Sequence, residues 1–373
     1  MSVSLRDKFI GCIAGCHIGS AMGAVTEAMD WQYIDEVYGF VDKPLPYQHP
    51  AKGFIKMFAD GDADKEKYLE ENPKWVCPAG TTEDGVERQR LMILAIRDKG
   101  GRVFADDVKE AWAKYMNPSS FGTLSMQFEE VLYLLAKAGI PGSDIGKYCD
   151  YSGLNSFSRA CHPIGLINAG NIQNAIKDVL EVGQLYQTAN SRGLKWACVT
   201  GVAIAAATKP DATVESVLQA IYDNCDPRVV FEIKRHIEGS AYCKNIQELR
   251  EYFDGVYSGK GVEFYFSTAA EVVTKGVCIF AMTRGNTKEA MIAGTNMGRD
   301  CDCIAAVAGG LAGALTGYES IPEEWFAMTD EATKQNQYTC SQLSVVEFAD
   351  ILFEAFRKQL AKQQAFVETM ENT

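Results

Sequence analysis

The segment that most constrains the fold is residues 304–317, in which nearly every position holds Ala, Gly or a medium-sized aliphatic residue. A helix that is apolar on all sides is buried, and its small side chains allow a neighbouring helix to approach closely. Asp300 and Asp302 stand just before this run. The sequence therefore predicts a central core helix whose N-terminus presents two carboxylates.

This acidic pair has two interpretations. An Asp at a helix N-terminus is favourable both as a cap and through the helix dipole. Two buried carboxylates without a cation are costly, however, and carboxylate oxygens are the ligands of hard divalent cations. From the residues alone, capping and a metal site are both open for Asp300 and Asp302.

A second acidic pair, Glu83 and Asp84, precedes a helix that we expect to run to about Arg97. Thr81 or Thr82 is the expected N-cap, and the two acids would then lie in the first turn. Two such arrangements, each at the start of a core helix, favour oxygen ligands that converge on divalent cations.

The N-terminal segment predicts a helix over residues 4–23. Glycine recurs there at every fourth position, at Gly11, Gly15, Gly19 and Gly23. Each glycine costs a helix about 1 kcal/mol relative to alanine, so the stripe predicts close packing on another helix, with residues 304–317 as the partner. Glu27 follows this helix. It would then stand at the mouth of the packed pair as a catalytic or binding carboxylate, or as a solvated helix-end residue.

The composition indicates a well-cored globular protein, with 47% hydrophobic and 23% charged residues among 373. A net charge of −13 argues against nucleic acid or an anionic membrane as the general partner. Twelve cysteines without a CxxC pair favour reduced, buried thiols. The first residues lack a signal-peptide core, and no apolar run reaches the ~18 residues of a membrane span. We therefore expect a cytoplasmic protein.

The remaining pattern is helical, with few alternating strand-like stretches. We expect an all-α, compact, orthogonal helical bundle that forms a single domain over residues 1–360. Residues 30–80 form a loop-rich excursion that can wall a substrate cleft, and residues 361–373 form a polar tail expected to fray. The further expected helices are 105–116, 124–138, 171–187, 193–208, 213–222, 226–238, 246–253, 267–284, 286–295 and 343–361.

Two polar loops supply candidate substrate contacts. The first, within residues 152–170, offers Asn155, Ser156, Arg159 and His162. A buried structural histidine is the commoner reading of His162. The second loop ends near Arg192, which is either a phosphate partner or an ordinary surface arginine.

Four segments taken in order resemble the motifs of the ADP-ribosylglycohydrolase family. Residues 15–27 resemble Gly-x-x-x-Gly-Asp-Ala-x-Gly-x-Pro-x-Glu, and residues 80–84 resemble the Thr-Asp-Asp-Thr motif. Residues 296–303 resemble Asn-x-Gly-Gly-Asp-Thr-Asp-Thr, and residues 305–325 resemble the Ala/Gly helix with the Ser-Ile-Pro-x-x-Trp that follows it. The similarity extends over roughly residues 6 to 357, and the last two motifs are the most specific.

The resemblance implies an all-α hydrolase that binds one or two Mg²⁺ ions, with Mn²⁺ as an alternative. The ligands implied by position are Thr82, Glu83, Asp84, Asp300, Asp302 and Cys303. Glu27 and Asp302 are the implied catalytic residues, with Glu27 in acid/base chemistry or gating. The implied substrate is an ADP-ribosyl adduct or a smaller nucleoside-like or glycosyl compound. The alternative is a family member that has lost catalysis and serves as a ligand-binding or structural protein.

Several positions depart from these motifs, and each bears on the metal site. Glu83 stands in place of Asp, and Gly85 in place of Thr. Cys303 replaces a threonine oxygen with sulfur, a poor partner for a hard ion. Arg299 stands in place of Gly and adds a cation that can substitute for one metal or bind a phosphate. The sequence thus leaves open whether two, one or no ions bind, and it leaves the oligomeric state open.

Overall fold

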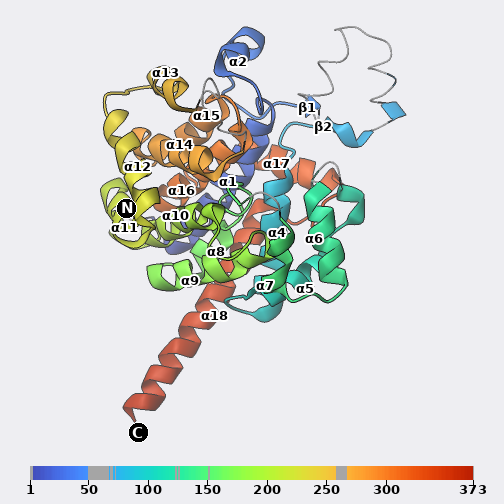
Figure 1. The fold of residues 1–373 in the computed structure, drawn as a ribbon, viewed down its shortest axis with the longest axis vertical. Coiled ribbons are helices and arrows are strands. Elements are labelled where there is room, and N and C mark those ends of the chain that lie inside the picture. The colour runs from blue at the N-terminus through green and yellow to red at the C-terminus, as the bar shows by residue number, and fades with distance from the viewer. Residues whose placement is uncertain are drawn as a thin grey trace.

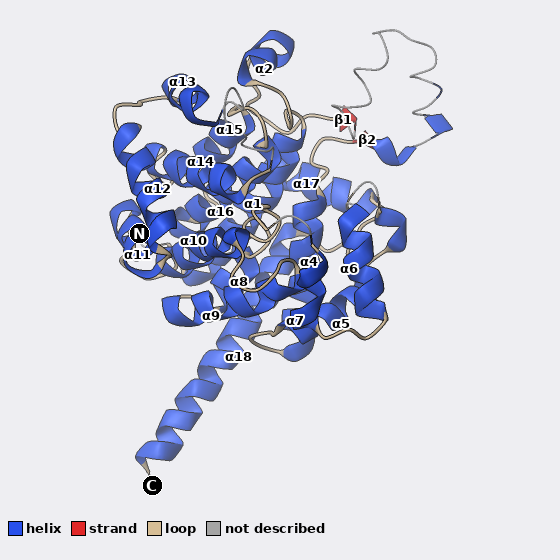
Figure 2. Ribbon diagram, in the orientation of Figure 1, coloured by secondary structure: helices blue, strands red, loops and turns tan. Residues whose placement is uncertain are grey.

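The computed structural model describes residues 3–48, 67, 70–71, 73–121, 124, 127–149, 152–257 and 267–372. Within these ranges the chain is built of helices (Figure 2). The strands of the described residues are β1 (Tyr47–Gln48) and β2 (Val76–Cys77), which pair antiparallel. The prediction of an all-α fold is confirmed.

The centre of the molecule is an antiparallel pair, α1 (Leu5–Ala24) and α16 (Cys301–Thr316), which make the most extensive helix contact of the described chain (Figure 1). The glycine stripe of α1 lies on this contact. A Cβ added at Gly19 would lie 2.6 Å from the carbonyl oxygen of Ala305, and Gly11, Gly15 and Gly23 are equally close to the backbone of α16. The predicted partnership of the two small-residue segments is therefore confirmed.

Other helices enclose this pair. α1 also packs on α15 (Thr287–Thr295) and α18 (Val345–Glu371), and α16 packs on α14 (Ala269–Met282) and α10 (Arg192–Ala207). The helix α4 (Asp84–Lys99) brings the second acidic pair to the same core, where it contacts α1, α8 (His162–Ile167) and α18.

The remaining helices lie around this central group of helices. They are α2 (Trp31–Tyr38), α5 (Ala105–Tyr115), α6 (Gln127–Lys137), α7 (Gly142–Ile145), α9 (Ile172–Val182), α11 (Val214–Asn224), α12 (Pro227–Gly239), α13 (Ile246–Tyr257) and α17 (Glu323–Gln335). Short 3₁₀ turns complete the set: η2 (Pro73–Trp75), η3 (Pro118–Ser120), η4 (Gly146–Tyr148) and η5 (Gly183–Leu185). The expected helices match within a few residues, except that residues 171–187 divide into α9 and η5 and that α13 is longer than predicted. α7, α8 and α17 were not predicted.

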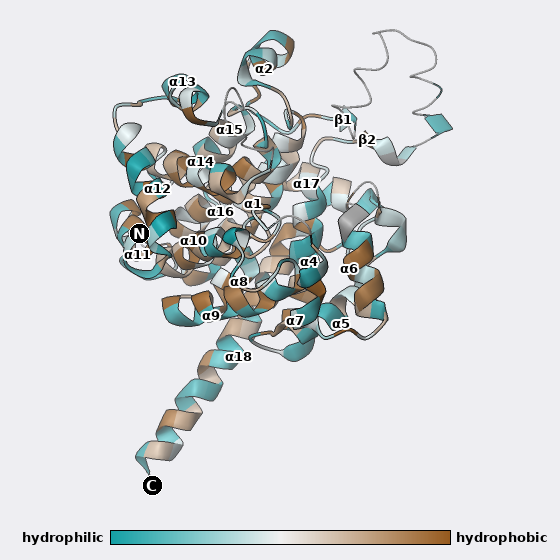
Figure 3. Ribbon diagram, in the orientation of Figure 1, coloured by the Kyte–Doolittle hydropathy of each residue, from teal (hydrophilic) through white to brown (hydrophobic). Residues whose placement is uncertain are grey.

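The C-terminal segment differs from its prediction. Instead of fraying after residue 361, α18 continues to Glu371 and projects from the body of the molecule (Figures 1 and 3). No Gly or Pro interrupts residues 345–371, and Gln364 Nε2 donates to Glu368 Oε1 across one turn at 3.0 Å. Good helix formers and such i,i+4 pairs sustain a solvated helix.

The expected excursion over residues 30–80 contains α2, β1, η2 and β2 in its described parts. Residues 49–66 lie outside the described ranges, so the expected cleft wall stays a prediction. None of the helices in the described part of the chain is long and apolar enough to cross a lipid bilayer.

Candidate active site

The antiparallel packing of α1 and α16 places the end of the first motif beside the start of the third. Two backbone hydrogen bonds join the segments: Ala28 N donates to Arg299 O at 2.6 Å, and Arg299 N donates to Met29 O at 2.7 Å. Glu27 is thereby held at the N-terminus of α16, where Asp302 occupies the first turn. The glycine stripe thus determines the position of a carboxylate as well as the packing of the core.

Glu83 completes a group of three acids with these residues. Side-chain oxygens of Glu27, Glu83 and Asp302 all lie within 4.8 Å of one another. Glu83 and Asp302 are buried, whereas Glu27 is partly exposed. Three carboxylates this close repel one another unless a cation lies among them.

The acids at the two helix N-termini do not serve as caps. Glu83, rather than Thr81 or Thr82, is the N-cap residue of α4, and its side chain makes no capping hydrogen bond. Asp300 is the N-cap residue of α16, and its side chain makes none either. Thr82 is buried just before α4. The capping interpretation of Asp300 is therefore wrong, and so is the expectation that Thr81 or Thr82 is the N-cap residue of α4.

The surroundings of Asp300 disfavour its charged form. Burial, followed by the neighbouring charge of Asp302, raises the pKa of Asp300 well above its usual range. Asn155 Nδ2 donates to Asp300 Oδ2 at 2.7 Å, while no donor among the described residues reaches Asp300 Oδ1. A buried acceptor that receives no hydrogen bond fits the role of a cation ligand.

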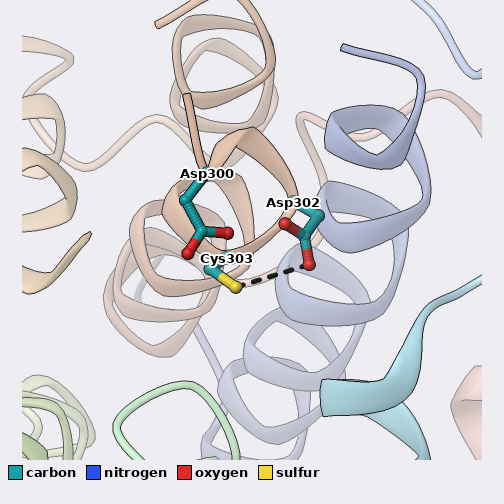
Figure 4. Close-up of side chains that lie close together, drawn as sticks. All are labelled: Asp300, Asp302 and Cys303. Atoms are coloured by element: carbon teal, nitrogen blue, oxygen red, sulfur yellow. Dashed lines mark hydrogen bonds between the residues drawn. The ribbon is translucent and has the colours of Figure 1, made fainter. Parts of the chain in front are cut away.

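Cys303 lies next to Asp300 and Asp302, and ligand atoms of the three lie within 4.8 Å of one another (Figure 4). Its Sγ donates to Asp302 Oδ2 at 3.4 Å. Burial raises the pKa of the Cys303 thiol well above its usual value, so the thiol is protonated at neutral pH. A neutral thiol is a poor ligand for a hard ion, and in this structure Cys303 acts as a hydrogen-bond donor to a ligand candidate.

The carboxylates of Glu83, Asp300 and Asp302 therefore suit a hard divalent cation, and Glu27 lies close to Glu83 and Asp302. All of these donors are oxygens, as Mg²⁺ and Mn²⁺ prefer. Thr82, which precedes Glu83 in the chain, is buried.

The other side of Asp302 already holds a cation. The guanidinium of Arg159 forms ion pairs with both Asp302 and Asp84. Arg88 also reaches Asp84, donating from Nη2 to Oδ2 at 2.6 Å, and it pairs with Glu129. Burial lowers the pKa of Arg159, but the surrounding anions outweigh this effect and raise it above its usual value. Arg159 is therefore a permanent charge inside the cluster.

Arg299, which the sequence suggested as a substitute for a metal or as a phosphate contact, forms an ion pair with Glu271. Its Nε and Nη2 donate to the two carboxylate oxygens of Glu271, at 2.7 and 3.0 Å. Glu271 also accepts from Lys275 Nζ at 2.8 Å. The sequence suggested Arg299 as the cation that replaces a metal because it adjoins Asp300, but the arginine inserted between two acids of the cluster is Arg159.

The sequence model of ADP-ribosylglycohydrolases matches residues 1–361. The chain belongs to the ADP-ribosylglycohydrolase family. An uncharacterized protein of Archaeoglobus fulgidus is 22% identical over 330 residues, which cover 86% of this chain and 91% of the relative. A solved structure described as an ADP-ribosylglycohydrolase-related protein complex has a TM-score of 0.60 at 17% identity, over 95% of this chain and 98% of that one. This structural likeness shows the fold.

The other candidate contacts in this ADP-ribosylglycohydrolase family member lie in varied surroundings. Ser156 is buried beside Asn155. His162 is fully buried at the start of α8, its Nδ1 lies 3.2 Å from Gln89 Nε2, and its ring packs on Gly310. Burial lowers the pKa of His162 to about 4. These contacts give His162 a packing role in the core rather than an open position.

Arg192 is exposed at the first position of α10. It lines a cavity of about 450 Å³ together with Lys195, Trp196 and Arg228. None of the described acids of the cluster lines this cavity. As a phosphate contact, Arg192 stays a prediction.

Sequence reasoning missed Arg88 and the role of Gly85. A Cβ added at Gly85 would overlap the guanidinium of Arg159. The signal for this contact was present in the sequence as a glycine in the first turn of a helix, at a position where the family motif has Thr.

Proposed function

We propose that this chain is a metal-assisted glycohydrolase that hydrolyses the bond between the anomeric carbon of a ribose and its leaving group. The substrate is an ADP-ribosyl adduct or a smaller ribosyl compound. The observation that carries the proposal is the convergence of Glu27, Glu83, Asp300 and Asp302 from three separate segments. Acids gathered this closely, most of them buried, are costly to the fold, and a catalytic centre accounts for that cost. Membership of the family supports the class of reaction.

The side chains divide the work according to their positions. Glu27 is the partly exposed carboxylate of the group, and in this proposal it takes a proton from the attacking water. In the reaction, the water oxygen bonds to the anomeric carbon, and the bond to the leaving group breaks with its electron pair. Glu27 then returns the proton to the leaving group. Asn155 holds Asp300 in place through its amide.

A divalent cation bound to the carboxylates would supply Lewis-acid polarisation of sugar oxygens and of water. Mg²⁺ is the proposed ion, with Mn²⁺ as the alternative. The ligands proposed are the carboxylates of Glu83, Asp300 and Asp302, with Thr82 beside them.

The test is hydrolysis by the purified full chain, first stripped with EDTA and then supplied with Mg²⁺. ADP-ribosyl-arginine and ADP-ribosyl-serine peptides, together with simple nucleosides, provide the two substrate classes. We expect release of ADP-ribose or ribose that depends on the added ion. An Asp223→Asn variant serves as the control, because Asp223 is an exposed acid on α11. A protein that binds Mg²⁺ but turns over none of these substrates would contradict the proposal.

A second candidate function is a ligand-binding protein that has kept the fold without the chemistry. The observation that favours it is Arg159, which fills part of the acidic cluster. Calorimetry with free ADP-ribose separates the two candidates. Binding without turnover of any adduct would favour the second.

A further inference from the structure

We propose that Arg159 replaces one divalent cation in the acidic cluster, so that this chain binds one ion fewer than the same cluster would without the arginine. The inference rests on the metal-assisted centre proposed above. It concerns the number of ions and the part of the site that remains charged when the ions are removed.

The first observation is what Arg159 bridges. Asp84 belongs to α4 and Asp302 to α16, and the Arg159 guanidinium forms an ion pair with each. All three side chains are largely buried. Arg88 also pairs with Asp84, but Arg159 is the cation that joins the two helices, and this is the place that a bridging metal ion would otherwise take.

The second observation is that the backbone holds Arg159 in this place. Arg159 N donates to Asn155 O at 3.3 Å, and Arg159 O accepts from Gln89 Nε2 at 2.7 Å. Gln89 belongs to α4, like Asp84, and Asn155 binds Asp300. The loop that delivers the guanidinium is thus tied to the same elements that carry the acids.

The third observation is the space made by Gly85. The residue lies in the first turn of α4 with an ordinary helical backbone, where alanine would favour the helix by about 1 kcal/mol. A Cβ there would overlap Nε, Cζ and Cδ of Arg159. Backbone conformation does not require the glycine, so the volume of the guanidinium accounts for it. Gly85 and Arg159 therefore form a matched pair.

A guanidinium differs from an ion in one respect that can be measured. It stays protonated at every pH that the fold survives and cannot be removed by a chelator. Arg159 thus compensates Asp84 and Asp302 permanently, while the group formed by Glu27, Glu83 and Asp302 is the one that the proposed function assigns to an ion from solution. The cluster is expected to remain folded in EDTA because part of its charge compensation belongs to the chain.

The experiment counts bound ions in the full chain. Titration calorimetry with Mn²⁺ and elemental analysis after dialysis are applied to the wild type and to Arg159→Ala. We expect the variant to bind one more ion per chain than the wild type. Its melting temperature should fall in EDTA and recover in Mn²⁺ by more than that of the wild type. Arg102→Ala is the control, because Arg102 pairs with Asp178 through two hydrogen bonds of 2.7 and 2.6 Å outside the cluster. This control should leave the ion count unchanged.

A second variant tests the same idea while keeping the arginine in the chain. Gly85→Ala takes the space of the guanidinium and should also raise the ion count by one. In the Arg159→Ala background the same change should be neutral or stabilising, which a double-mutant cycle detects as coupling between the two sites. Equal ion counts in the wild type and in both variants would overturn the inference, even if the enzyme hydrolyses its substrate. Conversely, a difference of one ion without any turnover would leave the inference standing and remove the proposed hydrolase function.

Discussion

Asp302 has two sets of neighbours, which we call its two sides, and they deal differently with the cost of a buried negative charge. On one side, Glu27 and Glu83 bring further carboxylate oxygens within 4.8 Å. On the other side, the guanidinium of Arg159 joins Asp302 to Asp84. In the proposed function the first side takes its cation from solution, whereas the second carries its cation in the chain. Stability and catalysis are therefore separable in this cluster: removal of ions should affect turnover more than folding.

The largest effect is expected from Asp302→Asn, because this residue belongs to both sides. The change removes a candidate ion ligand and one partner of Arg159. We expect turnover to fall about 10³-fold, the scale seen when a preorganised charge is lost from an active site. Mn²⁺ affinity should fall in parallel. Steady-state kinetics and metal titration check both effects, and an Asp302→Asn protein with wild-type turnover would refute the assignment of this residue.

Glu27→Gln should separate the two sides, because Glu27 lies on the ion-dependent side. The amide cannot accept the proton, so turnover should fall by about 10²-fold, the lower end for a lost general base. The melting temperature in EDTA should stay near the wild-type value, since the contacts of Arg159 are untouched. Glu354→Gln on the exposed face of α18 is the matched control and should change neither quantity. If Glu27→Gln lost much stability but kept normal turnover, Glu27 would have a structural role and not a catalytic one.

The packing that supports this comparison was predictable from the sequence. Glycines at every fourth residue of one segment and small residues throughout another indicate two helices in close contact, and the structure has that pair. The acidic motifs were recognisable because each directly precedes a core helix. Such patterns are predictable because each lies within a short segment of the chain.

The position of Arg159 was not predictable in the same way. Its partners Asp84 and Asp302 are distant in sequence, and Asp302 lies 143 residues away. Only the folded chain places α4 and α16 on either side of the guanidinium. Arg299 was the more conspicuous candidate because it adjoins Asp300, but its side chain pairs with Glu271, and its backbone has a positive φ of 67°. Adjacency in sequence was a poor guide to which cation enters the cluster.

The next effect concerns the glycine stripe that brings the two sides together. Gly19→Ala places a methyl group 2.6 Å from the carbonyl of Ala305, so α1 and α16 must separate. Overpacking of this kind costs about 1–3 kcal/mol of unfolding free energy. Gly255→Ala is the control within a helix, since a Cβ there meets nothing within 4 Å, and it should stabilise by up to about 1 kcal/mol.

Chemical denaturation measures both changes, and the ion affinity of Gly19→Ala tests whether helix separation also disturbs the cluster. Equal stabilities for the two alanine variants would show that the contact between α1 and α16 tolerates a wider spacing of the two helices. The geometry of the acids would then have to depend on other contacts.

The smallest effect is expected in the pH dependence of stability, and it concerns His162 outside the cluster. There the core keeps a side chain neutral instead of pairing its charge. Burial lowers the pKa of His162 to about 4. The stability that this neutral histidine contributes is complete above its unfolded pKa of about 6.5 and is lost as the pH falls toward 4. At pH 5.5 the loss is about 1 kcal/mol.

Denaturation of the wild type and of His162→Gln is measured between pH 7.5 and 4.5. The difference between the two isolates the contribution of His162 to the pH dependence of stability, because His17 and the acids are present in both proteins. The variant should lose stability less steeply below pH 6.5, whatever its stability at pH 7.5. Parallel curves would mean that His162 is protonated in the folded core at little cost. Arg159 and Arg88 are buried cations that are paired with acids, whereas His162 faces Gln89. A protonated His162 that the core tolerates would therefore weaken the distinction between compensated and excluded charge.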